Sequence, residues 1–198
     1  MEKTMNREVE KKIIETIKQH QAAVANLQAS QIKTIRAAAD MIIKSLKKKG
    51  CVYICGNGGS AADAQHIAGE LVGRFEQNRK GLAAVALTTD SSIITSAAND
   101  YGYQNIFVRQ VEALVKKGDI LWAISTSGTS PNIISAAKLA KKKGARVLAF
   151  TGIAGSPLEK LADICFCANH KSTARSQEIH QLAYHIICGL VEDSFARR

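Results

Sequence analysis

The sequence predicts an α/β fold in which a doubly wound parallel sheet is flanked by helices and follows two N-terminal helices. Short runs that are apolar on both faces alternate with longer amphipathic segments, which is typical of a parallel sheet covered on both sides. Three of the longer segments end in lysines followed by glycine, the pattern of a helix C-terminus with a left-handed cap. The two prolines, Pro131 and Pro157, both fit the first turn of a helix.

Length and composition agree with one domain of this class. The chain has 198 residues, of which 46% are hydrophobic, enough to bury a substantial core. No linker rich in proline or serine and no low-complexity stretch divides the sequence. We therefore expect a single domain over residues 1–198, with oligomerising helices in residues 1–50 and the α/β core and last helix in residues 51–198.

Taken in order, the N-terminal region should form two long helices, Arg7–Leu27 and Gln31–Lys49. Their apolar faces include Ile13, Ile17 and Ile42, yet neither helix has a strand of its own beside it in the sequence. Such unpartnered apolar faces favour packing against another subunit.

Five strands then alternate with four helices. The expected strands are Cys51–Cys55, Ala83–Leu87, Asp119–Ser125, Ala145–Thr151 and Ile164–Ala168. The expected helices are Ser60–Arg74, Tyr103–Lys117, Asn132–Lys143 and Thr173–Phe195. The helix ends with lysines are Lys47–Lys49 before Gly50, Lys116–Lys117 before Gly118, and Lys141–Lys143 before Gly144.

The net charge of +10 first suggests nucleic acid or another anion. Eight of the lysines stand at the three helix ends, however, and without those eight the net charge is only +2. Aromatic residues make up 5% of the chain, and no basic run is interleaved with Phe or Tyr as in a platform for stacked bases. We expect no nucleic-acid partner.

The sequence also predicts a cytoplasmic protein with no membrane partner. Its longest apolar runs, Ile120–Ile124 and Val147–Phe150, are far shorter than the roughly 20 residues of a membrane span. The first residues begin no hydrophobic signal segment. The five cysteines are odd in number and lie mostly in apolar stretches, so we expect buried, reduced thiols.

A glycine-rich loop follows the first expected strand. It reads Gly56-Asn57-Gly58-Gly59-Ser60 and opens directly into a helix, where backbone N–H groups form an anion site. The loop also fits the weak G-x-G-x-x-A dinucleotide pattern. A dinucleotide site needs an acidic residue about 20 positions further on, and the candidate, Asp90, lies well beyond that. An anion site is therefore the better interpretation.

A hydroxyl-rich loop follows the third expected strand. It reads Ser125-Thr126-Ser127-Gly128-Thr129-Ser130 and enters a helix at Pro131. One serine is enough to cap a helix, so this many hydroxyls favour a pocket for a compact anion over a simple cap. Because both loops follow strands of one parallel sheet, they can hold a single phosphorylated ligand at the switch point.

These two loops resemble the phosphate loops of the sugar isomerase (SIS) domain family, an α/β fold that binds phosphosugars. Within it, the chain is similar to the phosphoheptose isomerases over nearly its whole length. The stretches that carry this similarity are Cys55–Phe75, Ala86–Tyr103, Gln110–Asn132 and Ala174–His185. The resemblance implies a ketose–aldose isomerase of sedoheptulose 7-phosphate that makes D-glycero-D-manno-heptose 7-phosphate for bacterial lipopolysaccharide. It also implies a homotetramer with active sites at subunit boundaries.

Titratable residues lie on the helix after the first loop and on the last helix. His66 and Glu70 are four residues apart and so share one helix face. On an ordinary helix this would be a surface pair, but here the helix begins at the anion loop. Gln177 and His185 are about 80° apart around the last helix, whereas His180 points about 140° away from His185.

The resemblance assigns roles to these residues. It places Glu70, Gln177 and His185 in the active site, and the same three with His66 bind zinc in some members. Histidine and carboxylate are good zinc ligands, whereas an amide oxygen is weaker. An isomerase needs a base, for which Glu70 is the candidate, and an acid that also serves ring opening, for which His185 is suited. We expect Zn²⁺ as the cofactor.

The resemblance also implies contacts from Asn99 and Asp100 to the sugar hydroxyls, although from the residues alone an Asn-Asp turn that ends a helix is the simpler interpretation. The complete set of expected substrate-binding residues is Asn57, Gly58, Gly59, Ser60, Glu70, Asn99, Asp100, Ser125, Thr126, Ser127, Ser130 and Gln177. Three places depart from the family pattern: Gly69, Ser176 and the segment Phe166–Ser172. Since the segment Phe166–Ser172 would shape the sugar pocket, the sequence indicates the type of reaction more clearly than the identity of the sugar.

Two alternatives have the same fold. One is a binding protein similar to those that associate with the bacterial replication initiator, which keep the loops but lack the carboxylate and the second histidine. The presence of Glu70 and His185 favours the enzyme. The other is a sugar-phosphate sensor, which usually accompanies a DNA-binding module. The N-terminal helices lack the short glycine turn and basic recognition helix of such a module.

Overall fold

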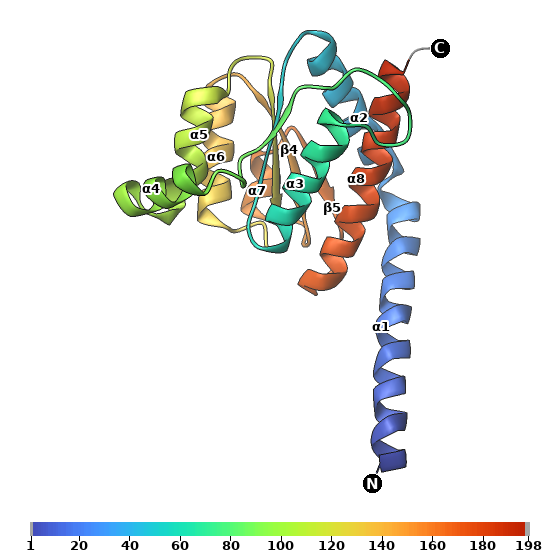
Figure 1. Ribbon diagram of the computed structural model, residues 1–198. Coiled ribbons are helices and arrows are strands. Elements are labelled where there is room, and N and C mark those ends of the chain that lie inside the picture. Colours follow the sequence, from blue (N-terminus) through green and yellow to red (C-terminus); the bar gives the residue numbers. More distant parts are fainter. Residues whose placement is uncertain (1, 197–198) are drawn as a thin grey trace.

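Five parallel strands form one sheet at the centre of the fold. The computed structural model describes residues 2–196 (Figure 1). The sheet has the order β2-β1-β3-β4-β5, and all four neighbouring pairs are parallel. The strands are β1 (Val52–Gly56), β2 (Ala84–Ala86), β3 (Ile120–Ser125), β4 (Arg146–Thr151) and β5 (Ile164–Cys167). The doubly wound parallel sheet and all five expected strands are confirmed.

Helices cover both faces of this sheet. They are α1 (Glu2–Ser30), α2 (Ile32–Lys47), α3 (Gly59–Val72), α4 (Ser91–Tyr101), α5 (Ile106–Leu114), α6 (Pro131–Lys142), α7 (Pro157–Leu161) and α8 (Thr173–Phe195), with a 3₁₀ turn η1 (Tyr103–Asn105). Helices α2, α3 and α8 pack on one face, and α5 and α6 pack on the other (Figure 1).

Alternation along the strands builds two cores. In β1, Val52 and Ile54 join the core under α2, α3 and α8, whereas Tyr53 and Cys55 join the core under α5 and α6. All five residues of β1 are buried. Two-sided burial explains why the strands are apolar throughout.

Two helices were not expected from the sequence. Helix α4 begins where Oδ1 of Asp90 accepts a hydrogen bond from the N–H of Ile93 at 2.9 Å, a standard N-cap. The short helix α7 begins with Pro157 at its first turn and Ser156 as its N-cap. The expectation for Pro157 was therefore right, although the helix itself had not been predicted.

The lysine-glycine ends differ from one another. Gly144 adopts the expected left-handed conformation, with φ of 81°. After α2, Lys49 and not Gly50 has a positive φ. Gly50 is needed there for close packing, because a Cβ at this position would lie less than 3.0 Å from the hydroxyl of Ser45. Helix α5 ends at Leu114, so Lys116–Lys117 lie in the following turn and not in a last helical turn, as had been predicted.

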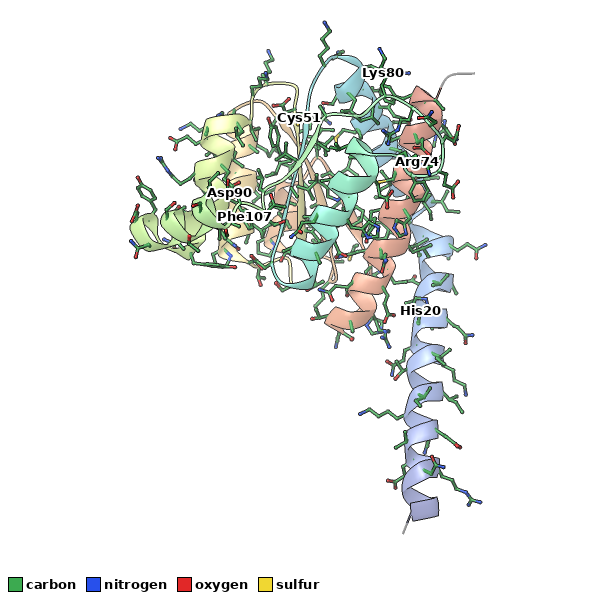
Figure 2. All side chains as sticks on the ribbon, in the orientation of Figure 1. His20, Cys51, Arg74, Lys80, Asp90 and Phe107 are labelled. Carbon is green, nitrogen blue, oxygen red and sulfur yellow. The ribbon has the colours of Figure 1, made fainter. Side chains whose placement is uncertain are left out.

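The N-terminal helix α1 extends well beyond the sheet (Figure 1). Its C-terminal half contacts α8, where Nδ1 of His20 lies 2.7 Å from Oε2 of Glu178 (Figure 2). Its outer half carries four apolar side chains that are about half exposed: Val9, Ile13, Ile14 and Ile17. This is the unpartnered apolar face that the sequence predicted for the first helix. For the second helix the prediction was wrong, because Ile42 is fully buried in the core beneath α2.

Two smaller expectations concern membranes and cysteines. Within residues 2–196, no helix is both long enough and apolar enough to cross a membrane. All five cysteines are free, and Cys55, Cys167 and Cys188 are buried, whereas Cys51 and Cys165 are partly exposed.

His180 lies in the core and away from the other titratable residues of α8, as the helical projection predicted. It is fully buried, and its Nε2 lies 3.0 Å from the carbonyl oxygen of Thr151. The rings of Phe150 and Phe166 pack beside it. Burial lowers the pKa of His180 to about 4, opposed by its bond to Thr151, so the imidazole is neutral at pH 7.

A pH dependence of stability follows from His180. Its pKa is lower in the folded chain than in the unfolded chain, so folding stability is complete above about pH 6.5 and falls as the pH drops toward 4, by about 3 kcal/mol. We expect urea unfolding to show this loss in the wild type and to show less of it in His180→Gln, which can still donate to Thr151. Equal pH slopes in the two proteins would contradict the neutral, buried state of His180.

Candidate active site

The two polar loops leave the sheet side by side. Gly56 at the end of β1 pairs with Ile124 near the end of β3. The chain passes from β1 to β2 on one side and onward to β3 on the other, so the strand order reverses between β1 and β3. Ligands of doubly wound folds bind at such a switch point. The expectation that the two loops lie at one edge of the sheet is therefore confirmed.

The first loop is shaped by its glycines. A Cβ at Gly56 would lie less than 3.0 Å from the backbone of Ser60, so only glycine permits this tight entry into α3. Gly58 has φ of 55°, in the left-handed region that favours glycine. The loop thus brings the N-terminus of α3, whose dipole favours an anion, to the carboxyl end of the sheet. The N–H groups of Ser60 and Ala61 donate there to the carbonyls of Asn57 and Gly58.

The second loop gathers its hydroxyl groups. The Oγ of Ser125 lies 3.0 Å from that of Ser130 and 3.4 Å from that of Ser127. Ser130 is the N-cap residue of α6, yet its side chain makes no capping hydrogen bond. Its hydroxyl therefore belongs to the loop cluster. Thr126 lies between Ser125 and Ser127, and its carbonyl accepts a hydrogen bond from Gly152.

A pair of amides ties the two loops together. Asn57 donates to Oδ1 of Asn132 at 3.0 Å, and Asn132 donates back to Oδ1 of Asn57 at 2.8 Å. The hydroxyl of Tyr103 donates to the same Oδ1 of Asn57 at 3.1 Å. Asn132 is 2% exposed. Neither Asn132 nor Tyr103 was among the expected site residues; an amide at the second position of α6, directly after the hydroxyl loop, is the signal that could have indicated Asn132.

Three titratable side chains meet between α3 and α8. Nε2 of His66 lies 2.9 Å from Oε1 of Glu70 and 3.4 Å from Nε2 of His185. The Glu70 side chain is 19% exposed and that of His66 is 41% exposed, so the cluster is open on one side. Burial and the charge of His66 lower the pKa of His185, and Glu70 acts in the opposite direction.

Two further residues support His66 from behind. The hydroxyl of Tyr184 lies 3.0 Å from its Nδ1. Asp63, one turn before His66 on α3, stands beside both, and burial raises its pKa to about 6 against the opposing effects of His66 and Tyr184. Because Nδ1 of His66 faces Tyr184, its Nε2 is directed toward Glu70 and His185. Neither Asp63 nor Tyr184 was predicted.

The cluster fits a metal ion. One nitrogen of His66, one nitrogen of His185 and one oxygen of Glu70 all lie within 4.8 Å of one another. Two imidazoles and a carboxylate are a common zinc donor set, and a partner on the far nitrogen of a histidine is the usual arrangement behind a metal ligand. The chemistry of these donors therefore suits Zn²⁺.

Gln177 lies elsewhere along α8. A Cβ on Gly59 would come less than 3.0 Å from its amide nitrogen, which places the amide over the N-terminus of α3. Gln177 is eight residues before His185, about 12 Å along the helix. Within one chain its amide therefore lies beside the first loop, and of the expected ligands His66, Glu70, Gln177 and His185 the structure brings the three titratable ones within 4.8 Å of one another.

Asn99 and Asp100 also lie apart from the loops within one chain. Both are exposed in the last turn of α4, and Nδ2 of Asn99 donates to Oδ1 of Asp100 at 2.8 Å. Among the side chains that the structure describes, no hydrogen bond links either residue to the two loops. Their helix projects to the side of the sheet away from α8 (Figure 1).

Comparison with known proteins gives consistent results. The family profile of the SIS domain matches residues 16–152. The phosphoheptose isomerase of Burkholderia pseudomallei (strain K96243) is 48% identical over 184 residues, which cover 92% of this chain and 93% of that protein.

Solved structures agree. The phosphoheptose isomerase GmhA from Neisseria gonorrhoeae superimposes with a TM-score of 0.89 at 37% identity, over 93% of this chain and 99% of the other. A phosphoheptose isomerase from Francisella tularensis also gives 0.89, at 35% identity, over 92% and 97% of the two chains.

Proposed function

Since the chain belongs to the phosphoheptose isomerases of the SIS domain family, we propose that it interconverts sedoheptulose 7-phosphate and D-glycero-D-manno-heptose 7-phosphate. This places it in the synthesis of bacterial surface heptose. The same proposal includes one SIS domain over the whole chain and a cytoplasmic location. The isomerase names of its relatives give no support to the alternative of a replication-initiator-associating protein.

One observation supports this function above the others. His66 and Glu70 lie on α3, the helix that begins at the anion loop, and meet His185 of α8 there; His66 is seven residues from Gly59, about 10 Å along α3. An extended seven-carbon sugar phosphate has its phosphate and its carbonyl at opposite ends, with a separation of the same order. The loops can therefore hold the phosphate while the carbonyl end reaches the cluster.

Neutral hydrogen-bond donors would bind the phosphate end of the substrate. Backbone N–H groups at the start of α3, with Ser60 and the hydroxyls of Ser125, Ser127 and Ser130, can surround a phosphate. Thr126, Asn57 and Gln177 complete the loop contacts that we propose. Asn99 and Asp100 stay as proposed sugar contacts that would have to come from the loop edge or from a neighbouring subunit.

The carbonyl end requires proton transfer. Glu70 takes a proton from C1 of the open-chain ketose, the C–H electron pair forms the C1–C2 double bond, and His185 gives a proton to the oxygen on C2. His185 then takes the proton from the oxygen on C1, and Glu70 returns its proton to C2. Each group ends in its starting state, which is the requirement for a catalyst.

The proposed cofactor is Zn²⁺, which His66, Glu70 and His185 would hold with one atom each, so that the second oxygen of Glu70 and the second nitrogen of His185 stay available for proton transfer. When bound, the ion would polarise the sugar oxygens and stabilise negative charge on them. Gln177, whose amide lies over Gly59 in this structure, stays the proposed fourth ligand.

Glu70→Gln tests the proposed base. Removing the base while keeping the shape should lower kcat at least about 100-fold, and binding of the sugar phosphate should change by less than threefold because the loops are intact. A coupled assay for the aldoheptose phosphate measures the first effect, and calorimetry measures the second. Glu112→Gln, an exposed carboxylate on α5, is the control. Full turnover by Glu70→Gln would rule out its role as the base.

Metal removal tests the cofactor. We expect zinc to remain with the purified wild type after dialysis and to be lost with a strong chelator, together with activity that added zinc restores. His185→Gln should retain less zinc under the same dialysis because one ligand is gone. Unchanged turnover in protein shown by elemental analysis to be free of zinc would contradict a catalytic ion.

We propose further that the protein is a homotetramer with active sites at subunit boundaries. The support within one chain is the exposed apolar face of α1, from Val9 to Ile17. Single apolar residues are common on surfaces, but four on one face of a projecting helix favour burial by another subunit.

Light scattering at micromolar concentration tests this assembly. The expected mass is four times the chain mass of 21.3 kDa, and Ile13→Glu/Ile17→Glu should give smaller species, because two charges would enter an apolar contact. Lys11→Gln/Lys18→Gln changes the net charge by the same two units on the polar face of the helix and should leave the mass unchanged. A monomeric wild type would contradict the proposal.

A further inference from the structure

A buried ion pair joins the segment after α3 to α8. This segment, residues 73–83, connects α3 to β2 and is called the strap here. Figure 2 shows Arg74 and Lys80 of the strap near the C-terminal part of α8. Below them, Nε of Arg79 lies 3.3 Å from Oε1 of Glu192, and both side chains are 1% exposed.

The carboxylate of Glu192 binds backbone N–H groups of the strap. It accepts hydrogen bonds from the N–H groups of Phe75 at 2.8 Å and of Glu76 and Gln77 at 2.7 Å each. Burial raises the pKa of Glu192, but these three donors and Arg79 outweigh that effect and lower it overall. The carboxylate is therefore charged, and it is fixed by four partners.

Arg79 holds the end of α3. Its Nη2 donates to the carbonyl of Glu70 at 2.6 Å, and its Nη1 donates to those of Leu71 at 2.8 Å and Gly73 at 3.0 Å. The carbonyls of Glu70 and Leu71 belong to the last turn of α3 and have no partners within the helix, and Gly73 is its C-cap residue. One guanidinium thus joins the helix end that carries Glu70 to the carboxylate on α8.

The two joined points lie beside the proposed catalytic groups. Glu192 is seven residues, two helical turns, after His185 on α8, so the two share one helix face. Phe75 of the strap packs against the imidazole of His185, with ring centroids 5.7 Å apart. The strap therefore contacts His185 through Phe75 and the backbone of Glu70 through Arg79.

Stability alone does not explain such a pair. Replacing a buried ion pair by apolar residues of similar size is often neutral or stabilising, because desolvation offsets the attraction. Glu70 and His185, in contrast, come from different helices, and proton transfer depends on their separation to within a fraction of an ångström.

We propose that Arg79 and Glu192 are positioning residues that set the placement of Glu70 relative to His185. This inference rests on the proposed isomerase function. Both residues act through the helices that carry the reacting groups, and neither touches the phosphate loops.

Arg79→Lys is the main test. Lysine keeps the charge but cannot donate to three carbonyls and also place a cation beside the carboxylate of Glu192. We expect kcat per folded molecule to fall at least tenfold, with KM and the affinity for inorganic phosphate changed by less than threefold. Glu192→Gln, which keeps nearly the same shape, should give a loss in the same direction and serves as the second variant if Arg79→Lys does not fold.

The matched controls come from the opposite edge of the sheet. Nε of Arg146 lies 3.2 Å from Oδ1 of Asp163, and Oδ2 of Asp163 accepts a hydrogen bond from the N–H of Val147 at 2.7 Å. Arg146→Lys and Asp163→Asn make the same chemical changes in an arginine–carboxylate pair away from the cluster, whose side chains are 60% and 20% exposed, and should leave kcat unchanged. If the role of Arg79 is purely structural, kcat per folded molecule of Arg79→Lys should also be unchanged. Any loss of total activity would then equal the loss of folded protein.

A crystal structure of Arg79→Lys separates this inference from the proposed function. We expect a changed separation of Glu70 and His185 there, and an unchanged one in Arg146→Lys. If kcat of Arg79→Lys stays within twofold of the wild type, or the separation stays unchanged, the positioning role is wrong. If the wild type does not turn over the sugar phosphate, the proposed function fails, and the crystal structure alone decides whether the pair positions these residues.

Discussion

The register between β1 and β3 is the constraint on which the site depends. Gly56 pairs with Ile124, so the loops that follow β1 and β3 leave the sheet side by side and in the same direction. The reciprocal amides of Asn57 and Asn132 then join the loops just above the sheet. From this edge α3 runs back along the sheet and carries His66 and Glu70 to α8. A change in strand register by one residue would separate the loops and reverse the faces of both cores.

Much of the fold could be predicted from the sequence because its signals are local. Two-faced apolar runs identified all five strands, and glycine and hydroxyl patterns identified both loops, since backbone conformation at a turn depends on the residues within it. Helix α4 was missed although Asp90 is a normal N-cap, because its exposed, mixed surface gives little periodicity. The lysine ends were only partly right: α5 ends two residues before Lys116, where the chain turns toward β3.

The candidate site was harder to predict from the sequence than the fold, because its residues meet through the packing of distant segments. His66 and Glu70 could be paired by helical spacing alone, and their meeting with His185 agreed with the family resemblance. The position of Gln177 depends on how closely α8 approaches Gly59, which no spacing encodes. In the same way, Asn132, Tyr184, Arg79 and Glu192 act through partners tens of residues away. Their importance is visible only when burial and distance are known.

The two loops proposed to bind the phosphate contain no lysine or arginine: the stretches Cys55–Ser60 and Ser125–Ser130 offer only hydroxyls, amides and backbone N–H groups. A pocket of this kind carries no titrating group of its own, so its charge stays constant across the physiological range. The strength with which it holds a phosphate ester then follows the second ionisation of the ester itself, near pH 6. It also depends less on added salt than a pocket built from ammonium groups, because short hydrogen bonds are not screened as separated charges are. In the proposed mechanism, binding of the phosphate is in this way uncoupled from the protonation of the histidines proposed to act at the other end of the substrate.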